Sequence, residues 1–176
     1  PIMLEIQPGN LTHAQLQQFM ELPNDVSLAD DCWASIDRSR SVVESLIEKG
    51  ETVYGLNTGF GLLANERISV GDLAKLQVNL VRSHSAGCGP LLDDKIVRLI
   101  ILLKAASLAR GYSGVRQEVV QILIDCLNKN VLPCIPSKGS VGASGDLAPL
   151  AHMSLALIGE GEVRFENKIL PAKQAL

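Results

Sequence analysis

The chain has 176 residues, enough for one domain with its own hydrophobic core. Acidic and basic side chains are interspersed and leave a net charge of −3, so nothing favours a nucleic-acid or anionic-membrane partner. Aromatic residues make up only 3% of a chain that is 47% hydrophobic, which is typical of aliphatic helix packing. The apolar run Leu99–Leu103 is too short to cross a bilayer, and residues 1–8 lack the basic start of a signal peptide. These features predict a cytoplasmic globular protein.

Helix signals follow one another along the chain. Three patterns predict capping boxes at helix starts: Thr12-x-x-Gln15, Ser27-x-x-Asp30 and Ser69-x-x-Asp72. The second is expected to open a helix that runs to Lys49, with an apolar face formed by Val42, Val43, Leu46 and Ile47. Further helices are expected over about residues 69–84, 93–111, 116–130 and 146–158, the last followed by Gly159 as its C′ residue.

Strand signals are few and short. Strands are expected over residues 3–7 and at Val53-Tyr54, and residues 162–168 predict a hairpin around Glu166-Asn167-Lys168. No internal repeat or low-complexity linker divides the chain. The predicted fold class is therefore mainly α with a few short β-strands, in a single domain spanning residues 1–176.

The cysteines and histidines do not suggest a metal centre. Cys32, Cys88, Cys126 and Cys134 show no Cys-x-x-Cys spacing, and His13, His84 and His152 are scattered. Reduced, buried thiols in a cytoplasmic protein are the expected state. For His152, in the middle of a predicted helix, packing or surface polarity is the expected role.

A glycine-rich run, Gly139-Ser140-Val141-Gly142-Ala143-Ser144-Gly145-Asp146-Leu147, carries most of the chemical information. Its simplest interpretation is a turn followed by an acidic helix N-cap. An anion site at the helix start is a second interpretation, but Lys138 precedes the glycines and Asp146 would repel an anion. A third is a backbone cyclisation. The Gly145 nitrogen attacks the Ala143 carbonyl, and loss of water and of the Ser144 hydroxyl leaves a methylene on an imidazolone.

Three blocks decide among these interpretations. The run from Ser137 to His152 resembles the signature of the aromatic amino acid ammonia-lyases. Two further blocks resemble other motifs of that family and occur in the same order: Tyr54-Gly55-Leu56-Asn57-Thr58-Gly59-Phe60-Gly61 and Asn79-Leu80-Val81-Arg82-Ser83-His84-Ser85-Ala86-Gly87. Within the family, the Ser83-His84 pair is more similar to the members that act on histidine than to those that act on phenylalanine or tyrosine.

The resemblance implies a function and a set of site residues. It implies non-oxidative deamination of L-histidine to urocanate and ammonia, with no external cofactor but a self-derived methylidene-imidazolone (MIO) from Ala143, Ser144 and Gly145. Tyr54 matches the family's catalytic tyrosine, which we expect to be the general base, and His84 matches its substrate-binding position. Supporting roles are expected for Asp146, Asn57 and Gly61. Phenylalanine or tyrosine deamination, and a noncatalytic helical domain, stay open as alternatives.

The resemblance also implies a longer protein. Family chains are roughly three times as long, so residues 1–176 are expected to be the N-terminal head region, without the central helix bundle and C-terminal part. Family members form homotetramers whose active sites draw on several subunits. We therefore expect the 176 residues alone to be inactive and their cyclisation to be impaired, because the reacting atoms must be held by rigid packing.

Overall fold

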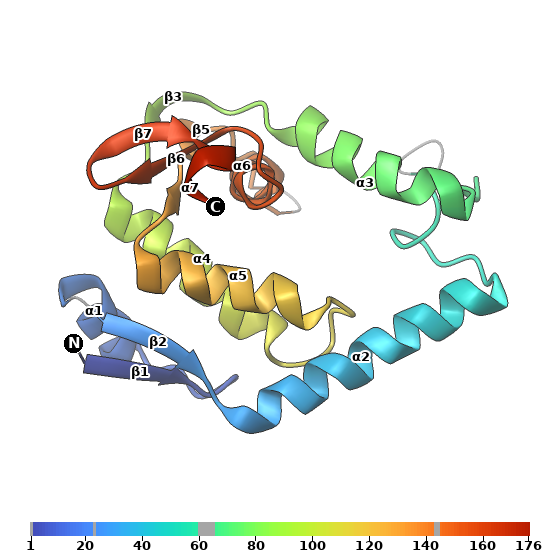
Figure 1. Ribbon diagram of the computed structural model, residues 1–176, viewed down its shortest axis with the longest axis horizontal. Helices are drawn as coiled ribbons and strands as arrows, with labels where there is room; N and C mark the ends of the chain where they lie inside the picture. The colour runs from blue at the N-terminus through green and yellow to red at the C-terminus, as the bar shows by residue number, and fades with distance from the viewer. Residues whose placement is uncertain (1, 23, 60–65, 143–144) are drawn as a thin grey trace.

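The computed structural model describes residues 2–22, 24–59, 66–142 and 145–176, and it is mainly helical with short strands, as expected. Figure 1 shows the arrangement. The helices are α1 (His13–Glu21), α2 (Asp30–Lys49), α3 (Val70–His84), α4 (Asp94–Leu108), α5 (Gln117–Lys129), α6 (Leu147–Leu157) and α7 (Ala172–Ala175). The strands are β1 (Ile2–Ile6), β2 (Asn24–Leu28), β3 (Cys88–Leu91), β4 (Leu132–Pro133), β5 (Pro136–Lys138), β6 (Glu162–Phe165) and β7 (Lys168–Pro171).

Helices α4 and α5 form the centre of the main core (Figure 1). In α5 the buried residues recur at helical spacing, from Val120 through Leu123 and Ile124 to Leu127, so one face of the helix is removed from water. The parallel pair β1–β2, joined by α1, packs beside them, with Ile6 fully buried. This core supports the prediction of aliphatic helix packing, and it anchors the elements that extend from it.

A smaller core forms between α6 and the three-stranded sheet near the C-terminus. Val131, Ala156, Val163 and Ala172 are buried together, which joins α6 to the antiparallel sheet of β4, β6 and β7. The hairpin β6–β7 turns through Glu166 and Asn167, both with positive φ, as the sequence predicted. This cluster fixes the C-terminal end of α6 against the sheet.

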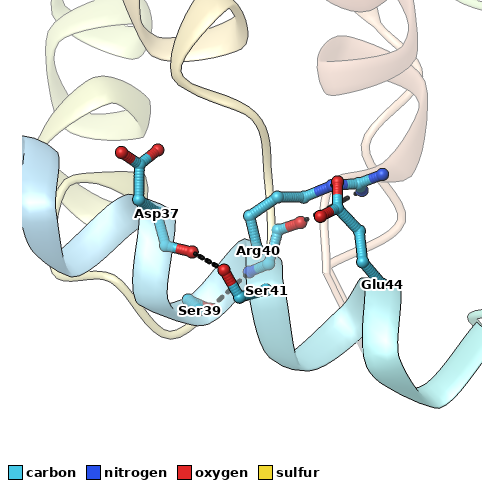
Figure 2. Close-up of polar contacts among 6 residues, drawn as sticks. Asp37, Ser39, Arg40, Ser41 and Glu44 are labelled. Atoms are coloured by element: carbon cyan, nitrogen blue, oxygen red, sulfur yellow. Dashed lines mark hydrogen bonds and ion pairs between the residues drawn. The ribbon is translucent and has the colours of Figure 1, made fainter.

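The long helix α2 is attached to the connection between α4 and α5. Figure 2 shows the polar contacts around Arg40 and Ser39 on α2. The Ser39 hydroxyl accepts a hydrogen bond from the Gly114 nitrogen at 2.8 Å, and an Arg40 guanidinium nitrogen lies 3.5 Å from the Gly114 carbonyl oxygen. Arg40 also pairs with Glu44, one turn further along the helix, at 2.8 Å. From this attachment α2 runs outward, and α3 returns along the opposite side of the molecule (Figure 1).

The predicted helix starts are correct in part. Thr12 forms the expected capping box, with the Gln15 nitrogen donating to its hydroxyl and the Gln15 side chain accepting from the Thr12 nitrogen. Ser69 is an N-cap, but its hydroxyl donates to the Asp72 carboxylate at 2.6 Å and accepts no backbone bond. The capping box predicted at Ser27 is wrong, because Ser27 lies in strand β2 and pairs with β1, and α2 begins only at Asp30.

Two further expectations need correction. Val42 is 59% exposed, so the apolar face of α2 is narrower than predicted and keeps Val43, Leu46 and Ile47 only partly buried. The Val53-Tyr54 segment forms no strand and instead enters a turn, in which the Leu56 and Asn57 nitrogens both donate to the Val53 carbonyl oxygen. Within the described ranges, no helix is both long and apolar enough to cross a membrane.

Candidate functional site

The turn before α6 is shaped by glycines. Gly142 has φ +64° and Gly145 has φ +128°, conformations that residues with a Cβ rarely adopt. Among the residues that the structure describes, no atom outside the adjacent residues lies within 4 Å of a Cβ built on either glycine, so their positive φ is what favours glycine here. Ala143 and Ser144, the other two residues of the predicted imidazolone, lie outside the described residues. The open backbone at Gly145 nevertheless suits the nitrogen that the cyclisation needs.

The two ends of this turn are tied together by side chains. The Ser140 hydroxyl donates a hydrogen bond to the Asp146 carboxylate. Asp146 occupies the N-cap position of α6, but its side chain makes no capping hydrogen bond, so the prediction of a side-chain cap is wrong. The physical reason is competition, because the carboxylate is engaged with Ser140 across the turn. The Asp146 side chain therefore does not cap the first N–H groups of α6, which lie beside the turn.

Tyr54 lies in the connection between α2 and α3 and is 64% exposed. The connection is held by Asn57, which is only 3% exposed. The Asn57 side-chain oxygen accepts from the Val53 nitrogen at 2.8 Å, and its amide nitrogen donates to the Glu51 carbonyl oxygen at 2.7 Å. Asn57, for which a supporting role is expected, makes both of these hydrogen bonds to the backbone of its own loop. Gly61 lies outside the described residues.

Thr58, which sequence reasoning did not single out, is 1% exposed beside Asn57. Its hydroxyl accepts from the Gly55 nitrogen at 3.3 Å and donates to the Gly59 carbonyl oxygen at 2.9 Å. Burial of a polar side chain is tolerated when its hydrogen bonds are made internally. The only signal for Thr58 in the sequence was its place between two glycines of the loop, where a hydroxyl can form hydrogen bonds with nearby backbone groups.

His84 is the last residue of α3 and is exposed. Its Nδ1 atom lies 2.8 Å from the Leu80 carbonyl oxygen and 3.2 Å from the Ser83 hydroxyl. Because a carbonyl oxygen only accepts, Nδ1 carries the proton in this contact, and Nε2 is the acceptor nitrogen of the neutral ring. The helix end thus fixes the ring orientation and presents Nε2 for another partner.

The structure brings His84 toward the glycine-rich turn, but it does not bring Tyr54 there. Helices α3 and α6 contact each other, and a Cβ built on Gly139 would lie 3.0 Å from Cα of Gly87, three residues after His84. The connection that carries Tyr54 meets α3 at its other end (Figure 1). A helix the length of α3 separates its two ends by roughly 20 Å. Tyr54 and the Gly87–Gly139 contact therefore belong to segments that adjoin opposite ends of α3.

The cysteines offer no competing site. Cys32 and Cys126 are buried, Cys134 is intermediate and Cys88 is exposed on β3, so the expectation of buried thiols holds for two of them. Burial raises the pKa of the Cys126 thiol to about 11, which disfavours a thiolate nucleophile. In the parts of the chain that the structure describes, no three His, Cys, Asp or Glu side chains gather as metal ligands.

Known proteins resemble this chain in both sequence and fold. The aromatic amino acid lyase family matches residues 11–176. Histidine ammonia-lyase of Vibrio cholerae is 54% identical over 173 residues, which are 98% of this chain and 34% of that protein. The structure of histidine ammonia-lyase from Trypanosoma cruzi has a TM-score of 0.89 at 34% identity, covering 99% of this chain and 34% of that one. For ergothionase from Treponema denticola, the TM-score is 0.93 at 30% identity, covering 98% and 35%. The chain spans about a third of the length of the curated relatives it matches.

Proposed function

The chain belongs to the aromatic amino acid lyase family, and from this premise we propose that the enzyme it is part of deaminates L-histidine to urocanate and ammonia. The similarity at 54% identity to a histidine ammonia-lyase is the observation that carries the proposal. The fold alone does not select the substrate, because an ergothionase superposes as closely as a histidine ammonia-lyase. The choice of histidine therefore rests on sequence identity and on His84.

The reaction requires an electrophile that the ordinary side chains do not supply. A proton leaves the β-carbon, its bonding electrons form the new double bond, and the carbon–nitrogen bond breaks with its electrons departing on ammonia. An MIO group formed from Ala143, Ser144 and Gly145 supplies the electron-accepting chemistry that makes both departures feasible. The described part of the turn fits this group, since Gly145 has a permissive backbone and Ser140 and Asp146 hold the turn ends together. The uncapped start of α6 stabilises negative charge beside it.

Tyr54 is the proposed general base that takes the β-carbon proton. Its exposed side chain lies on a loop that the buried Asn57 amide keeps in shape. We propose that Tyr54 acts in an active site to which more than one copy of the chain contributes. A homotetramer with shared active sites, as the family resemblance implies, satisfies this requirement.

His84 is the proposed substrate-binding residue. Its ring is oriented through Nδ1 by the Leu80 carbonyl oxygen, so Nε2 can accept a hydrogen bond from the N–H of a substrate imidazole. The phenyl ring of phenylalanine offers no such donor, which favours histidine over phenylalanine. The phenol hydroxyl of tyrosine is also a donor, so the choice of histidine over tyrosine rests on sequence identity.

The 176 residues alone are proposed to be inactive. They form the head region of the longer enzyme, which we place in the cytoplasm, where the buried thiols of Cys32 and Cys126 stay reduced. The residues of the central helix bundle and C-terminal part complete the site. The competing proposal is a noncatalytic helical domain that keeps the motif without its chemistry.

Intact-mass measurement combined with a urocanate assay tests these proposals. The full-length enzyme is expected to weigh two water molecules less than its sequence and to release urocanate from histidine, whereas a Ser144→Ala variant should do neither. Ser140→Thr, which keeps the hydroxyl facing Asp146, is the matched control and should retain both. A full-length protein of uncyclised mass that does not turn over histidine would support the noncatalytic alternative. Urocanate production by residues 1–176 alone would contradict the proposed inactivity.

A further inference from the structure

His152 makes a specific hydrogen bond that surface polarity does not explain. It lies within α6, half-buried, and its Nε2 atom accepts from the backbone nitrogen of Gly87 at 3.0 Å. An imidazole nitrogen accepts only when it carries no proton, so the neutral ring holds its proton on Nδ1. The sequence predicted packing or surface polarity for this residue. The structure instead shows it joining α6 to the segment that follows α3.

The segments around this bond are closely packed at two glycines. A Cβ built on Gly87 would lie 3.1 Å from the His152 Nε2 atom and 3.3 Å from the Lys138 carbonyl oxygen. A Cβ built on Gly139 would lie 3.0 Å from the Gly87 Cα atom and 3.1 Å from the Ala148 Cβ atom. Three segments distant in sequence therefore meet at one junction, which we define as Gly87, Gly139, Ala148 and His152.

The junction connects the two functional segments of the site. Gly87 follows His84 by three residues, and Gly139 opens the turn that reaches Gly145. Within the 84–87 segment, the Ala86 nitrogen donates to the His84 carbonyl oxygen at 2.8 Å, so the segment is compact. A movement of Gly87 would therefore be transmitted to the end of α3 and to the His84 ring.

The surroundings favour the neutral imidazole. Burial lowers the pKa of His152, with no other cause contributing to the shift. The titratable or charged residues on the elements that pack against α6 are Asp72, Lys75, Arg82 and His84 of α3, Lys138 of β5 and Lys173 of α7. Asp146 and Glu160 flank α6, and Cys88 of β3 follows Gly87. Arg82 is paired with Glu160, and Asp146 accepts from Ser140.

We propose that His152 is a positioning residue of the lyase site: through its hydrogen bond to Gly87 it holds His84 at a fixed place relative to the turn before α6. In this role it acts through Gly87 and His84 and not directly on the substrate. The catalytic consequence rests on the proposed function, whereas the positioning itself is a property of the fold. Loss of the bond should weaken substrate binding more than it slows the chemical step, because His84 orients the substrate and the electrophile forms elsewhere.

Two variants of the full-length protein separate the hydrogen bond from packing. His152→Gln keeps an acceptor near the Nε2 position and does not titrate, whereas His152→Leu keeps the bulk and removes the acceptor. Hydrogen exchange measured by mass spectrometry should be about tenfold faster over residues 85–89 in His152→Leu, and close to wild type in His152→Gln. The KM for histidine should rise about tenfold in His152→Leu with a smaller change in kcat, and His152→Gln should restore it.

The pH dependence gives an independent readout. In the wild-type protein KM should rise as the pH falls and His152 becomes protonated, and in His152→Gln this contribution should be absent.

His13→Gln replaces an exposed histidine on α1; it is the matched control and should leave exchange and kinetics unchanged. Equal behaviour of the Gln and Leu variants, or wild-type exchange over residues 85–89 in His152→Leu, would overturn the proposal. If the wild-type enzyme does not deaminate histidine, the proposed function fails, while the exchange experiment still decides whether His152 positions Gly87.

Discussion

Arg82 and Glu160 form a two-point ion pair between α3 and the residues after α6. The Arg82 Nε atom lies 2.9 Å from Glu160 Oε2, and its Nη2 atom lies 2.5 Å from Oε1. Arg82 precedes His84 by two residues, and Gly87, which is bonded to His152, follows His84 by three. The chain around the end of α3 is thus held at two points, by Glu160 after α6 and by His152 within it, one on each side of the predicted substrate-binding residue.

The ion pair should make a pH-dependent contribution to stability. The hydrogen bonds from Arg82 hold the pKa of Glu160 below its ordinary value of 4.5. A lowered carboxyl pKa in the folded state stabilises the protein above the unfolded-state pKa, and this stabilisation is lost as the pH falls through the folded-state value. Glu160→Gln should therefore lower the thermal midpoint slightly at pH 7 and not at all in strong acid. The exposed pair should also weaken with added salt. A difference that grows toward acid pH would contradict this assignment.

Replacing the buried Asn57 amide should destabilise the loop that carries Tyr54. Asn57→Ala leaves the Val53 nitrogen and the Glu51 carbonyl oxygen without their partner, at a cost of about 1–3 kcal/mol. Urea unfolding and hydrogen exchange over residues 51–59 measure the global and the local effect. Asn10→Ala is the control, because Asn10 is exposed and its replacement should change neither quantity. Unchanged protection in Asn57→Ala would mean that its hydrogen bonds do not hold the loop.

A methyl group at Gly111 should disturb the attachment of α2. Its Cβ would lie 2.7 Å from backbone atoms of Ser35, and the residue has φ +76°, so crowding and backbone strain act together. Gly111→Ala is expected to lower the free energy of unfolding by about 2–4 kcal/mol. Gly9 has a similar φ of +84° with nothing within 4 Å of its Cβ, so Gly9→Ala should show the strain alone, about 1 kcal/mol. Equal losses in the two variants would show that α2 is not closely packed at Gly111.

Removing the Tyr54 hydroxyl should abolish most turnover without affecting formation of the electrophile. In the full-length enzyme, Tyr54→Phe is expected to reduce kcat by about 10²–10⁴-fold, the usual contribution of a general base. The intact mass should still show the loss of two water molecules. Tyr112→Phe is the matched control, since Tyr112 is 84% exposed on the connection between α4 and α5. Near-normal turnover in Tyr54→Phe would exclude Tyr54 as the base.

Replacing His84 should change substrate preference. His84→Leu removes the acceptor proposed for the substrate imidazole, so kcat/KM for histidine should fall about 10–100-fold, while the relative activity toward phenylalanine should rise. The ratio of the two kcat/KM values is the quantity to measure. His13→Leu is the control, because His13 is exposed on α1, remote from the turn in sequence. An unchanged ratio in His84→Leu would remove His84 from substrate recognition.

Local signals in the sequence predicted much of the helical framework. The starts and ends of α3 to α6 were placed within a few residues, because helix periodicity, caps and terminal glycines act over short distances. The hairpin at Glu166 and Asn167 and the turn glycines Gly142 and Gly145 followed for the same reason. Strands whose partners are far away in the chain were missed, such as β3, where Cys88 pairs with Lys138 of β5.

Three motifs in a fixed order identify the family from the amino-acid sequence, and they name the residues that are candidates for the chemistry. The positions of those residues relative to one another depend on the packing of the fold. The fold buries Asn57 within the loop that carries Tyr54, and it joins His152 to Gly87. The physical reason is that a motif specifies side chains and local backbone conformation, whereas contacts between distant segments are set by which helix faces pack together.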